Sequence, residues 1–214
     1  MINVPVHIER NLQHLSGILF AALMTFGTKS DAFEFSSLSK SDQATLQAGN
    51  VLMLERRPGE AAPGDKRFVT VAKLIKGSRK TIWEIVIDKD NTDKFLDGVL
   101  ESRIVKKSGN EIIVEQRTHV GGPKGSYKYT LKYLLFPEKV AEFTFVKGEI
   151  KNAEGAWWIF DGPTPDRKLV VYALHIDPGV FAPQFVVKRG MKKTLPETII
   201  AIDVETQRRE KLSR

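Results

Sequence analysis

Six consecutive strand-like segments constrain the fold of this chain more than any other feature of its sequence. Short links that contain turn-forming residues, such as Ser108-Gly109-Asn110 and Pro137-Glu138, separate the segments. Strands joined by links this short must pair as antiparallel neighbours, so the sequence predicts a meander. The predicted strands are Glu101–Lys107, Glu111–Val120, Ser126–Phe136, Val140–Glu149, Ala156–Phe160 and Lys168–Ile176.

One side of this predicted sheet should be covered. In the third strand, Tyr127, Tyr129, Leu131, Tyr133 and Leu135 alternate with polar residues, so the apolar residues share one face. The segment from Gln184 to about Gln207 follows a turn at Asp177-Pro178-Gly179, and it supplies the cover: Val187, Met191, Leu195, Ile199 and Ile202 recur every three or four residues, as on one side of a helix.

Two further elements precede the meander. Phe68 to Ile75 reads as a strand, and Ser78 is an N-cap for a helix from Arg79 to Ile87, followed by a second short helix that carries Phe95 and Leu96. The fold class is therefore α+β, with a strongly curved seven-stranded antiparallel sheet wrapped around a long C-terminal helix. Residues 33–65 are predicted to form a helical extension and linker, with a helix between Ser39 and Gly49, and residues 66–214 to form the main domain.

The first 32 residues are predicted to be a signal peptide. Residues 15–27 form an uncharged apolar run of 13 residues, too short to span a bilayer but typical of a secretory core segment. Arg10 precedes the run, and Ser30-Asp31-Ala32 places small residues where a signal peptidase would cut, after Ala32. We therefore expect a periplasmic or secreted protein. The alternative is a buried or amphipathic N-terminal helix in a cytoplasmic protein.

Composition excludes several kinds of chemistry. The chain has no cysteine, so disulfides, thiolate metal sites and a cysteine nucleophile are excluded. The usual signatures of serine hydrolases, zinc proteases and nucleotide-binding loops are missing, and we expect no cofactor and no metal. The formal net charge of +7 favours anionic partners, but no nucleic-acid-binding motif accompanies it, so we expect no nucleic-acid partner.

Two histidines of the main domain are the candidates for acid–base chemistry. His119 and His175 both lie on predicted strands, and either could act if it faced a cavity beside a carboxylate. A histidine at a strand end that hydrogen-bonds to the backbone is the simpler interpretation. The sequence therefore predicts no catalytic residue.

Several blocks of sequence resemble the helix-grip fold of the START-like superfamily of lipid-transfer proteins and polyketide cyclases or dehydrases. The blocks are Val71–Trp83, Phe95–Ser102, Gly155-Ala156-Trp157-Trp158, Tyr172–Gly179 and Met191–Pro196, and together they cover about residues 67–205. The resemblance implies an apolar cavity between the sheet and the last helix, which binds lipids, sterols, quinones or polyketides. It implies no shared catalytic motif.

We therefore expect a non-enzymatic protein that binds or transports a hydrophobic ligand, with a polyketide cyclase or dehydratase as the alternative. If the N-terminal run is retained, a cytoplasmic quinone-binding or chaperone-like module is a third interpretation. The candidate ligand-binding residues are Trp157, Tyr172, Leu174, Tyr127, Tyr129, Tyr133, Val187, Met191, Leu195 and Ile199, each of which could instead be ordinary core.

Two smaller sets of residues complete the expected site. Phe181, Phe185 and Gly122 are predicted to form a gate, because turn-forming residues surround them. Lys188, Arg189, Lys192 and Lys193 lie beside the apolar stripe of the last helix and could dock the protein on an anionic membrane surface, although they could equally be a solvated face.

Overall fold

The computed structural model describes residues 33–119, 125–179 and 183–213. The predicted signal peptide with His7 and His14, and the gate residues Gly122 and Phe181, lie outside this part of the chain. In order, the described elements are η1 (Phe35–Ser37), α1 (Lys40–Gln47), β1 (Leu52–Leu54), β2 (Val69–Lys76), α2 (Arg79–Ile87), η2 (Lys89–Lys94), β3 (Val99–Ser108), β4 (Glu111–His119), β5 (Ser126–Phe136), β6 (Val140–Gly148), β7 (Asn152–Asp161), β8 (Arg167–Asp177) and α3 (Gln184–Leu212).

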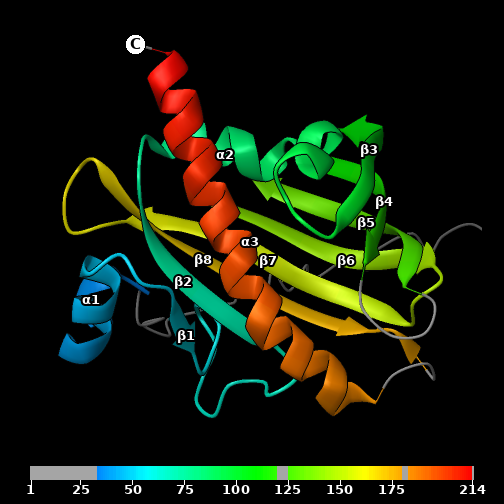
Figure 1. Cartoon of the computed structure of the whole chain (residues 1–214), viewed down its shortest axis with the longest axis horizontal. Coiled ribbons are helices and arrows are strands. Elements are labelled where there is room, and N and C mark those ends of the chain that lie inside the picture. The colour runs from blue at the N-terminus through cyan, green and yellow to red at the C-terminus, as the bar shows by residue number, and fades with distance from the viewer. Residues whose placement is uncertain (1–32, 120–124, 180–182, 214) are drawn as a thin grey trace, which may run out of the picture. The chain divides into compact units, whose positions relative to one another are not determined.

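The strands form one antiparallel sheet in the order β1-β2-β8-β7-β6-β5-β4-β3 (Figure 1). The expected meander is β3 to β8, and β2 pairs with β8, so that Val69 lies opposite Leu174. The described residues contain eight strands rather than the expected seven. The additional strand, β1, comes from the segment predicted as a linker, where Leu52 pairs with Ala72 along the open edge of β2.

Strand β7 begins earlier than predicted. Residues 152–155 read as a turn in the sequence, yet they pair with β8 from Asn152 opposite Asp177 to Gly155 opposite Leu174. This strand position is occupied by Gly155 because a side chain would not fit there. A Cβ atom at this position would lie 2.1 Å from the carbonyl oxygen of Ala173 and 2.6 Å from Cζ of Phe143. The glycine thus marks close packing within the sheet and not a turn.

Helix α2 starts where the sequence predicts. The hydroxyl of Ser78 accepts a hydrogen bond from the backbone N–H of Thr81, which caps the helix. The helix buries Ile82, Trp83, Ile85 and Val86 in the main core. The second short helix is η2, a 3₁₀ helix that ends at Lys94, so the prediction that it carries Phe95 and Leu96 was wrong. Both residues follow the helix and pack against the main core.

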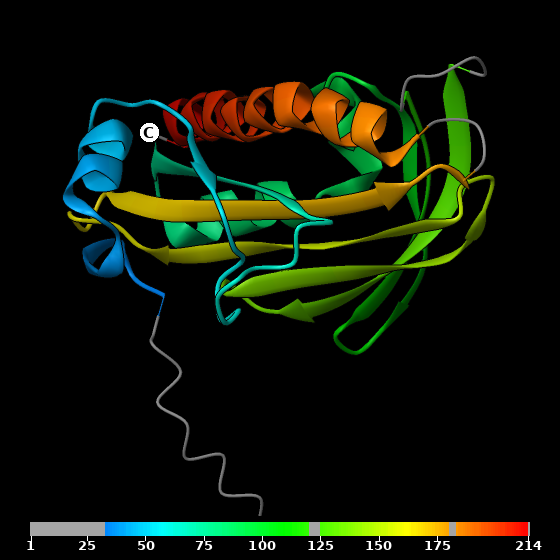
Figure 2. The same ribbon diagram turned by 90° about the horizontal axis from the view of Figure 1, so that it is seen from below.

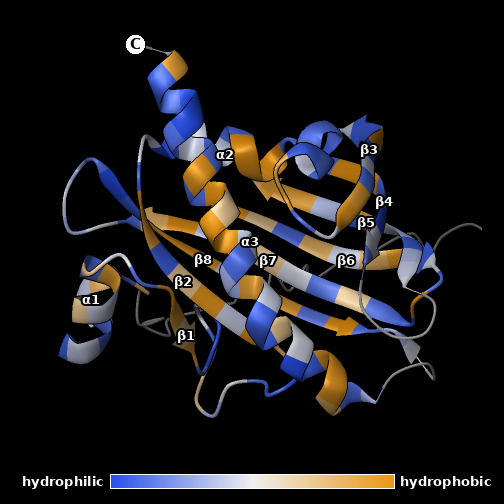
Figure 3. Ribbon diagram, viewed as in Figure 1, coloured by the Kyte–Doolittle hydropathy of each residue, from blue (hydrophilic) through white to orange (hydrophobic). Residues whose placement is uncertain are grey.

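Helix α3 lies across the concave face of the sheet (Figure 2). It buries the five residues of the predicted stripe, Val187, Met191, Leu195, Ile199 and Ile202, which join side chains of the sheet and α2 in one core cluster. The helix continues to Leu212, beyond the expected end at Gln207. Figure 3 shows the alternation of apolar and polar residues along it. No helix of the described chain is both long and apolar enough to cross a membrane.

The convex face carries a second, smaller core. The N-terminal extension, residues 33–54, packs there against the outward side chains of β2, β7 and β8. This cluster consists of Phe35, Leu46, Ala72, Leu74, Leu169 and Val171, with Phe33, Leu38, Leu52, Leu54, Trp158 and Phe160 packed against it. The same strands therefore bury side chains on both faces.

Candidate functional site

The candidate site is the aromatic interior between the concave face and α3. The ten residues predicted to bind ligand all belong to, or pack against, the main core cluster. At its centre the rings of Trp157 on β7 and Tyr172 on β8 stack, with their centroids 3.9 Å apart and an angle of 7° between their planes. The register explains the stack, because Trp157 is directly opposite Tyr172. The geometry thus brings the predicted residues together, whereas their binding role stays a prediction.

Three tyrosines, Tyr129, Tyr133 and Tyr172, belong to this interior or pack against it. The pKa of Tyr133 is raised well above its ordinary value, first by burial and then by Tyr172 and Tyr129. Burial also raises the pKa of Tyr172, with a smaller contribution from Tyr129. All three phenols therefore remain protonated at neutral pH and can donate hydrogen bonds.

The hydroxyl of Tyr129 is oriented by neighbours on β4. Gln116 Nε2 donates to it at 3.1 Å, and Thr118 Oγ1 donates to it at 3.0 Å. Because both neighbours are donors here, the Tyr129 oxygen accepts twice and its own proton remains available for donation. In the described chain the hydroxyls of Tyr133 and Tyr172 take part in no hydrogen bond. The interior thus offers hydrogen-bond donors to a bound molecule.

Lys89 is a functional candidate that our sequence analysis missed. It is the first residue of η2 and is only 6% exposed, and its Nζ atom lies 4.6 Å from the centroid of the Tyr133 ring. Burial lowers the pKa of Lys89 to about 8, and the charge of Asp88 offsets this only in part. A signal was present in the sequence, since Ile82, Val86 and Lys89 continue one side of a helix. The polar run from Asp88 to Lys94 hid it by resembling an exposed turn.

A second lysine on the concave face shows how a buried ammonium group is ordinarily accommodated. Lys73 lies on β2 under α3, with Nζ 3.4 Å from Oδ2 of Asp203. It also donates a hydrogen bond of 2.5 Å to the carbonyl oxygen of Gly49. Lys73 therefore forms a structural ion pair with Asp203, whereas the ammonium group of Lys89 lies against the face of the Tyr133 ring.

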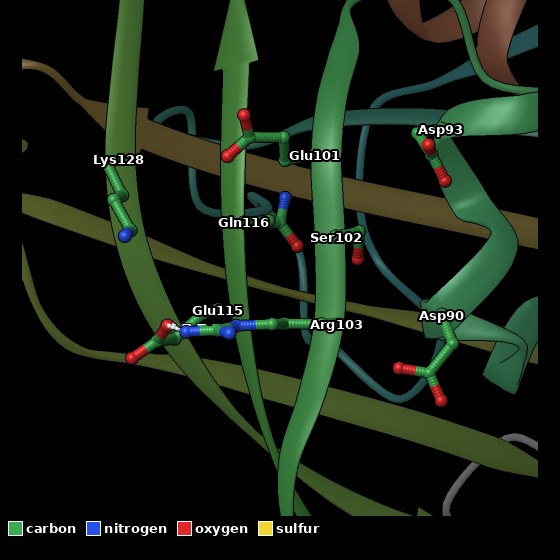
Figure 4. A pocket seen from close by; sticks show the side chains of 8 residues that line it. All are labelled: Asp90, Asp93, Glu101, Ser102, Arg103, Glu115, Gln116 and Lys128. Carbon is green, nitrogen blue, oxygen red and sulfur yellow. Dashed lines mark hydrogen bonds and ion pairs between the residues drawn. The ribbon is translucent and has the colours of Figure 1, made fainter.

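A polar pocket of about 390 Å³ opens between η2 and strands β3 to β5 (Figure 4). Gln116, which lines this pocket, also donates to Tyr129 in the interior. A second pocket of about 410 Å³ lies between η2 and the C-terminal half of α3. The residues that line the first pocket are Asp90, Asp93, Glu101, Ser102, Arg103, Glu115, Gln116 and Lys128.

The two candidate histidines do not face the interior. His119 is exposed at the end of β4, where its backbone N–H donates to Gly98 at 2.7 Å. His175 alternates with the inward-facing Leu174 and Ile176, so it lies on the convex face, beside the ring of Phe68. Within the described ranges there is no group of three or more side chains suited to hold a metal ion.

The family of the chain follows from a comparison with known protein families. Residues 75–203 match the family described as polyketide cyclase/dehydrase and lipid transport. The chain belongs to this family. The matched range runs from the end of β2 to α3 and includes every residue of the candidate interior on β5, β7 and β8. The expected START-like helix-grip fold is thereby confirmed.

Solved structures with similar folds include both cyclases and lipid-transfer proteins. A START superfamily protein from Mycobacterium smegmatis is 16% identical, with a TM-score of 0.58 over 66% of this chain and 97% of that one. A STAR-related lipid transfer protein from Xanthomonas axonopodis is 17% identical, with a TM-score of 0.57 over 65% and 85%. The Zhui aromatase/cyclase from a Streptomyces species is 14% identical, with a TM-score of 0.55 over 69% and 95%. A search of curated proteins found no match.

The predicted gate and docking residues lie at the start of α3. Phe185 is 75% exposed in its first turn. Arg189, Lys192 and Lys193 are exposed, whereas Lys188 is half-buried and donates to the backbone carbonyl of Lys66. Lys188 is therefore engaged with the chain itself, and the other three basic residues face solvent.

Proposed function

We propose that this protein binds and carries a hydrophobic molecule of the lipid, sterol, hopanoid or quinone class in the interior between its sheet and α3. The observation that carries the proposal is the lining, in which stacked aromatic rings and aliphatic side chains pack together with three buried tyrosines. Apolar walls with a few placed polar groups are the usual form of a small-molecule site. The family includes lipid transport, which agrees with this interpretation.

The alternative function, a cyclase or dehydratase, requires an acid–base pair that faces the bound molecule. His119 and His175 are the histidines of the described chain, and both lie away from the interior. Lys89 is titratable and inside, but it forms no ion pair with a carboxylate, and the neighbouring Asp88 is bound to Arg209 and Asn91. The arrangement therefore supports binding over catalysis.

We further propose that the protein works in the cell envelope, after export and cleavage behind Ala32. The apolar run of residues 15–27 and the small residues before the cleavage position support this. N-terminal sequencing of protein from its native host should then begin at Phe33. Recovery of an intact Met1 in the cytoplasmic fraction would contradict export.

Contact with an anionic membrane is a related proposal. Phe185 and Val186 are exposed in the first turn of α3, and Arg189, Lys192 and Lys193 follow them on solvent-facing positions. Exposed apolar residues beside basic residues are typical of surfaces that dock on anionic lipid. Reversing the three basic residues to Glu should weaken binding to phosphatidylglycerol vesicles and leave phosphatidylcholine vesicles unaffected. Unchanged binding would assign these residues to solvation.

The decisive test of the carrier function is uptake of a neutral apolar dye. Protein purified from its host should release a hydrophobic molecule on extraction, as seen by mass spectrometry, and the delipidated protein should bind Nile red with one site. Met191→Trp would place a larger ring into the interior and should abolish uptake while the protein stays folded. Met191→Leu, which nearly conserves volume, is the matched control and should retain uptake.

The opposite result is equally clear. If the parent protein releases no hydrophobic molecule and takes up no Nile red, the interior is an ordinary core. Met191→Trp should then overpack it and destabilise the fold by about 1–3 kcal/mol. That combination would overturn the carrier function.

A further inference from the structure

Lys89 presents a buried positive charge that the described chain does not neutralise. Between residues 33 and 119, 125 and 179, and 183 and 213, its Nζ atom makes no hydrogen bond and no ion pair. The nearest acidic residue, Asp88, is already engaged. Its Oδ2 accepts from Arg209 at 2.7 Å, and its Oδ1 accepts from Asn91 at 2.7 Å. An ammonium group on a side chain that is only 6% exposed and has no acceptor in the described chain is unfavourable unless another molecule contacts it.

The groups that face Lys89 from neighbouring elements are either hydrogen-bond donors or the faces of aromatic rings. From β5, Tyr133 presents its ring, and Tyr129 and Tyr172 are close enough to Tyr133 to contribute to its raised pKa. From α3, Arg209 binds the neighbouring Asp88 and is also paired with Glu205. The surroundings of Lys89 therefore combine one positive charge with phenolic O–H donors, and they lack a negative charge directed at it.

An assembly of donors around one buried cation is complementary to a single negative charge. We infer that Lys89, with the hydroxyls of Tyr129, Tyr133 and Tyr172, binds the carboxylate of an amphipathic acid whose apolar part lies against the stacked rings of Trp157 and Tyr172. This inference rests on the proposed function and specifies its ligand class. The ligand would supply the acceptor that Lys89 lacks, and its two oxygens could accept from the ammonium and the phenols together.

A carboxylate fits this arrangement better than a more highly charged group. One lysine supplies one positive charge, and Arg209, which binds the neighbouring Asp88, is already paired with two carboxylates. A phosphate monoester, with a charge near −2, would therefore remain partly uncompensated in a buried site.

The test compares two forms of one fluorescent chain, cis-parinaric acid and its methyl ester, which differ in the negative charge. The delipidated full chain should bind the acid about tenfold or more tightly than the ester near pH 7, because a charge-assisted hydrogen bond is lost in the ester. Lys89→Met should lower the affinity for the acid to that for the ester and leave the affinity for the ester unchanged. Lys89→Arg keeps the charge and should retain part of the preference.

A matched control comes from the same 3₁₀ helix. Lys94 is exposed and donates to Oδ1 of Asn91 at 2.6 Å. Lys94→Met removes the same charge a few residues away and should preserve the preference for the acid. Circular dichroism of each variant establishes that it is folded.

The possible outcomes separate this inference from the proposed function. Equal affinity for acid and ester, or an unchanged preference in Lys89→Met, would overturn the carboxylate site while leaving hydrophobic binding intact. Failure of both probes and of Nile red would overturn the proposed function as well. Palmitate should displace parinaric acid better than hexadecyl phosphate does, and the reverse order would overturn the assignment to a carboxylate.

Discussion

Trp157 and Trp158 are adjacent in the sequence but belong to different parts of the molecule. Trp157 points to the concave face, stacks on Tyr172 and is 4% exposed. Trp158 points to the convex face and packs against the cluster under the N-terminal extension. Because successive side chains of a strand point to opposite faces, one strand contributes to two interiors with different chemistry. The two interiors differ in the polar groups that they leave without a hydrogen-bond or ion-pair partner.

The convex cluster is satisfied by its own contacts. Apart from Trp158, it consists of Phe, Leu, Ala and Val side chains, and the rings of Phe33 and Phe160 lie 5.1 Å apart. These side chains have no polar groups and need only close packing. The concave interior includes phenols without an acceptor and a lysine without a carboxylate. Hydrophobic burial therefore stabilises both faces, whereas the concave interior also contains phenols and an ammonium group that a ligand could satisfy.

The largest expected effect would come from a cavity on the convex face. Leu169 is fully buried there, and Leu169→Ala should destabilise the protein by about 3–4 kcal/mol, measured by urea denaturation. Nile red affinity per folded molecule should remain that of the parent, because the affected face does not line the site. A variant that lost the dye but kept its stability would contradict the separation of the two faces.

A smaller effect of opposite sign is expected on the concave face. In the ligand-free protein, Lys89→Met should raise stability by about 2–3 kcal/mol near neutral pH, because it removes a buried, uncompensated charge. The native pKa of about 8 is below the ordinary value of 10.5, which applies in the unfolded chain. The penalty is therefore complete below pH 8, shrinks as the pH rises from 8 to 10.5, and is absent above that range.

Urea denaturation at several pH values checks this expectation. The groups that face Lys89 and could also titrate are Asp88 and the phenols of Tyr129, Tyr133 and Tyr172, and the phenols have pKa values raised above 10. Lys73→Met is the contrasting variant, since it leaves Asp203 without its ion-pair partner and should lower stability. A stability gain in both variants would mean that the two lysines are equivalent.

The smallest effect distinguishes the neighbouring tryptophans directly. Trp157→Phe and Trp158→Phe should each cost about 1 kcal/mol, since each replaces one large ring by a smaller one. Binding of parinaric acid should quench the tryptophan fluorescence of the parent and of Trp158→Phe, and the quenching should largely disappear in Trp157→Phe. Trp83 provides the same background in both variants. Equal quenching in the two variants would place the ligand elsewhere.

The sequence was sufficient to predict elements in which a residue pattern repeats. It was insufficient to predict features that depend on a single tertiary contact. Alternation along β5 and the three-and-four spacing of α3 specify which side chains face each other, and both predictions were confirmed. The predicted β7 was too short because Gly155 is typical of a turn in sequence. In the structure, Phe143 and Ala173 on the neighbouring strands leave no room for a side chain at this position, so it must be glycine. β1 was missed because a strand of three residues is too short to show an alternation of apolar and polar residues. Lys89 was missed because local polarity suggested exposure, and only the tertiary fold places Tyr133 beneath it.

The pairing of β2 with β8 has a consequence for how the chain folds. The meander from β3 to β8 can form from neighbours in sequence, hairpin by hairpin. Val69 meets Leu174 only after the whole meander lies between them, so this step closes a long loop and has a high entropic cost. α3 follows β8 in the chain and packs mainly on β2 and α2, with further contacts to β8. During synthesis the concave interior therefore stays open until nearly the whole polypeptide has emerged, and a hydrophobic ligand present at that stage could be enclosed as the last strand and helix join.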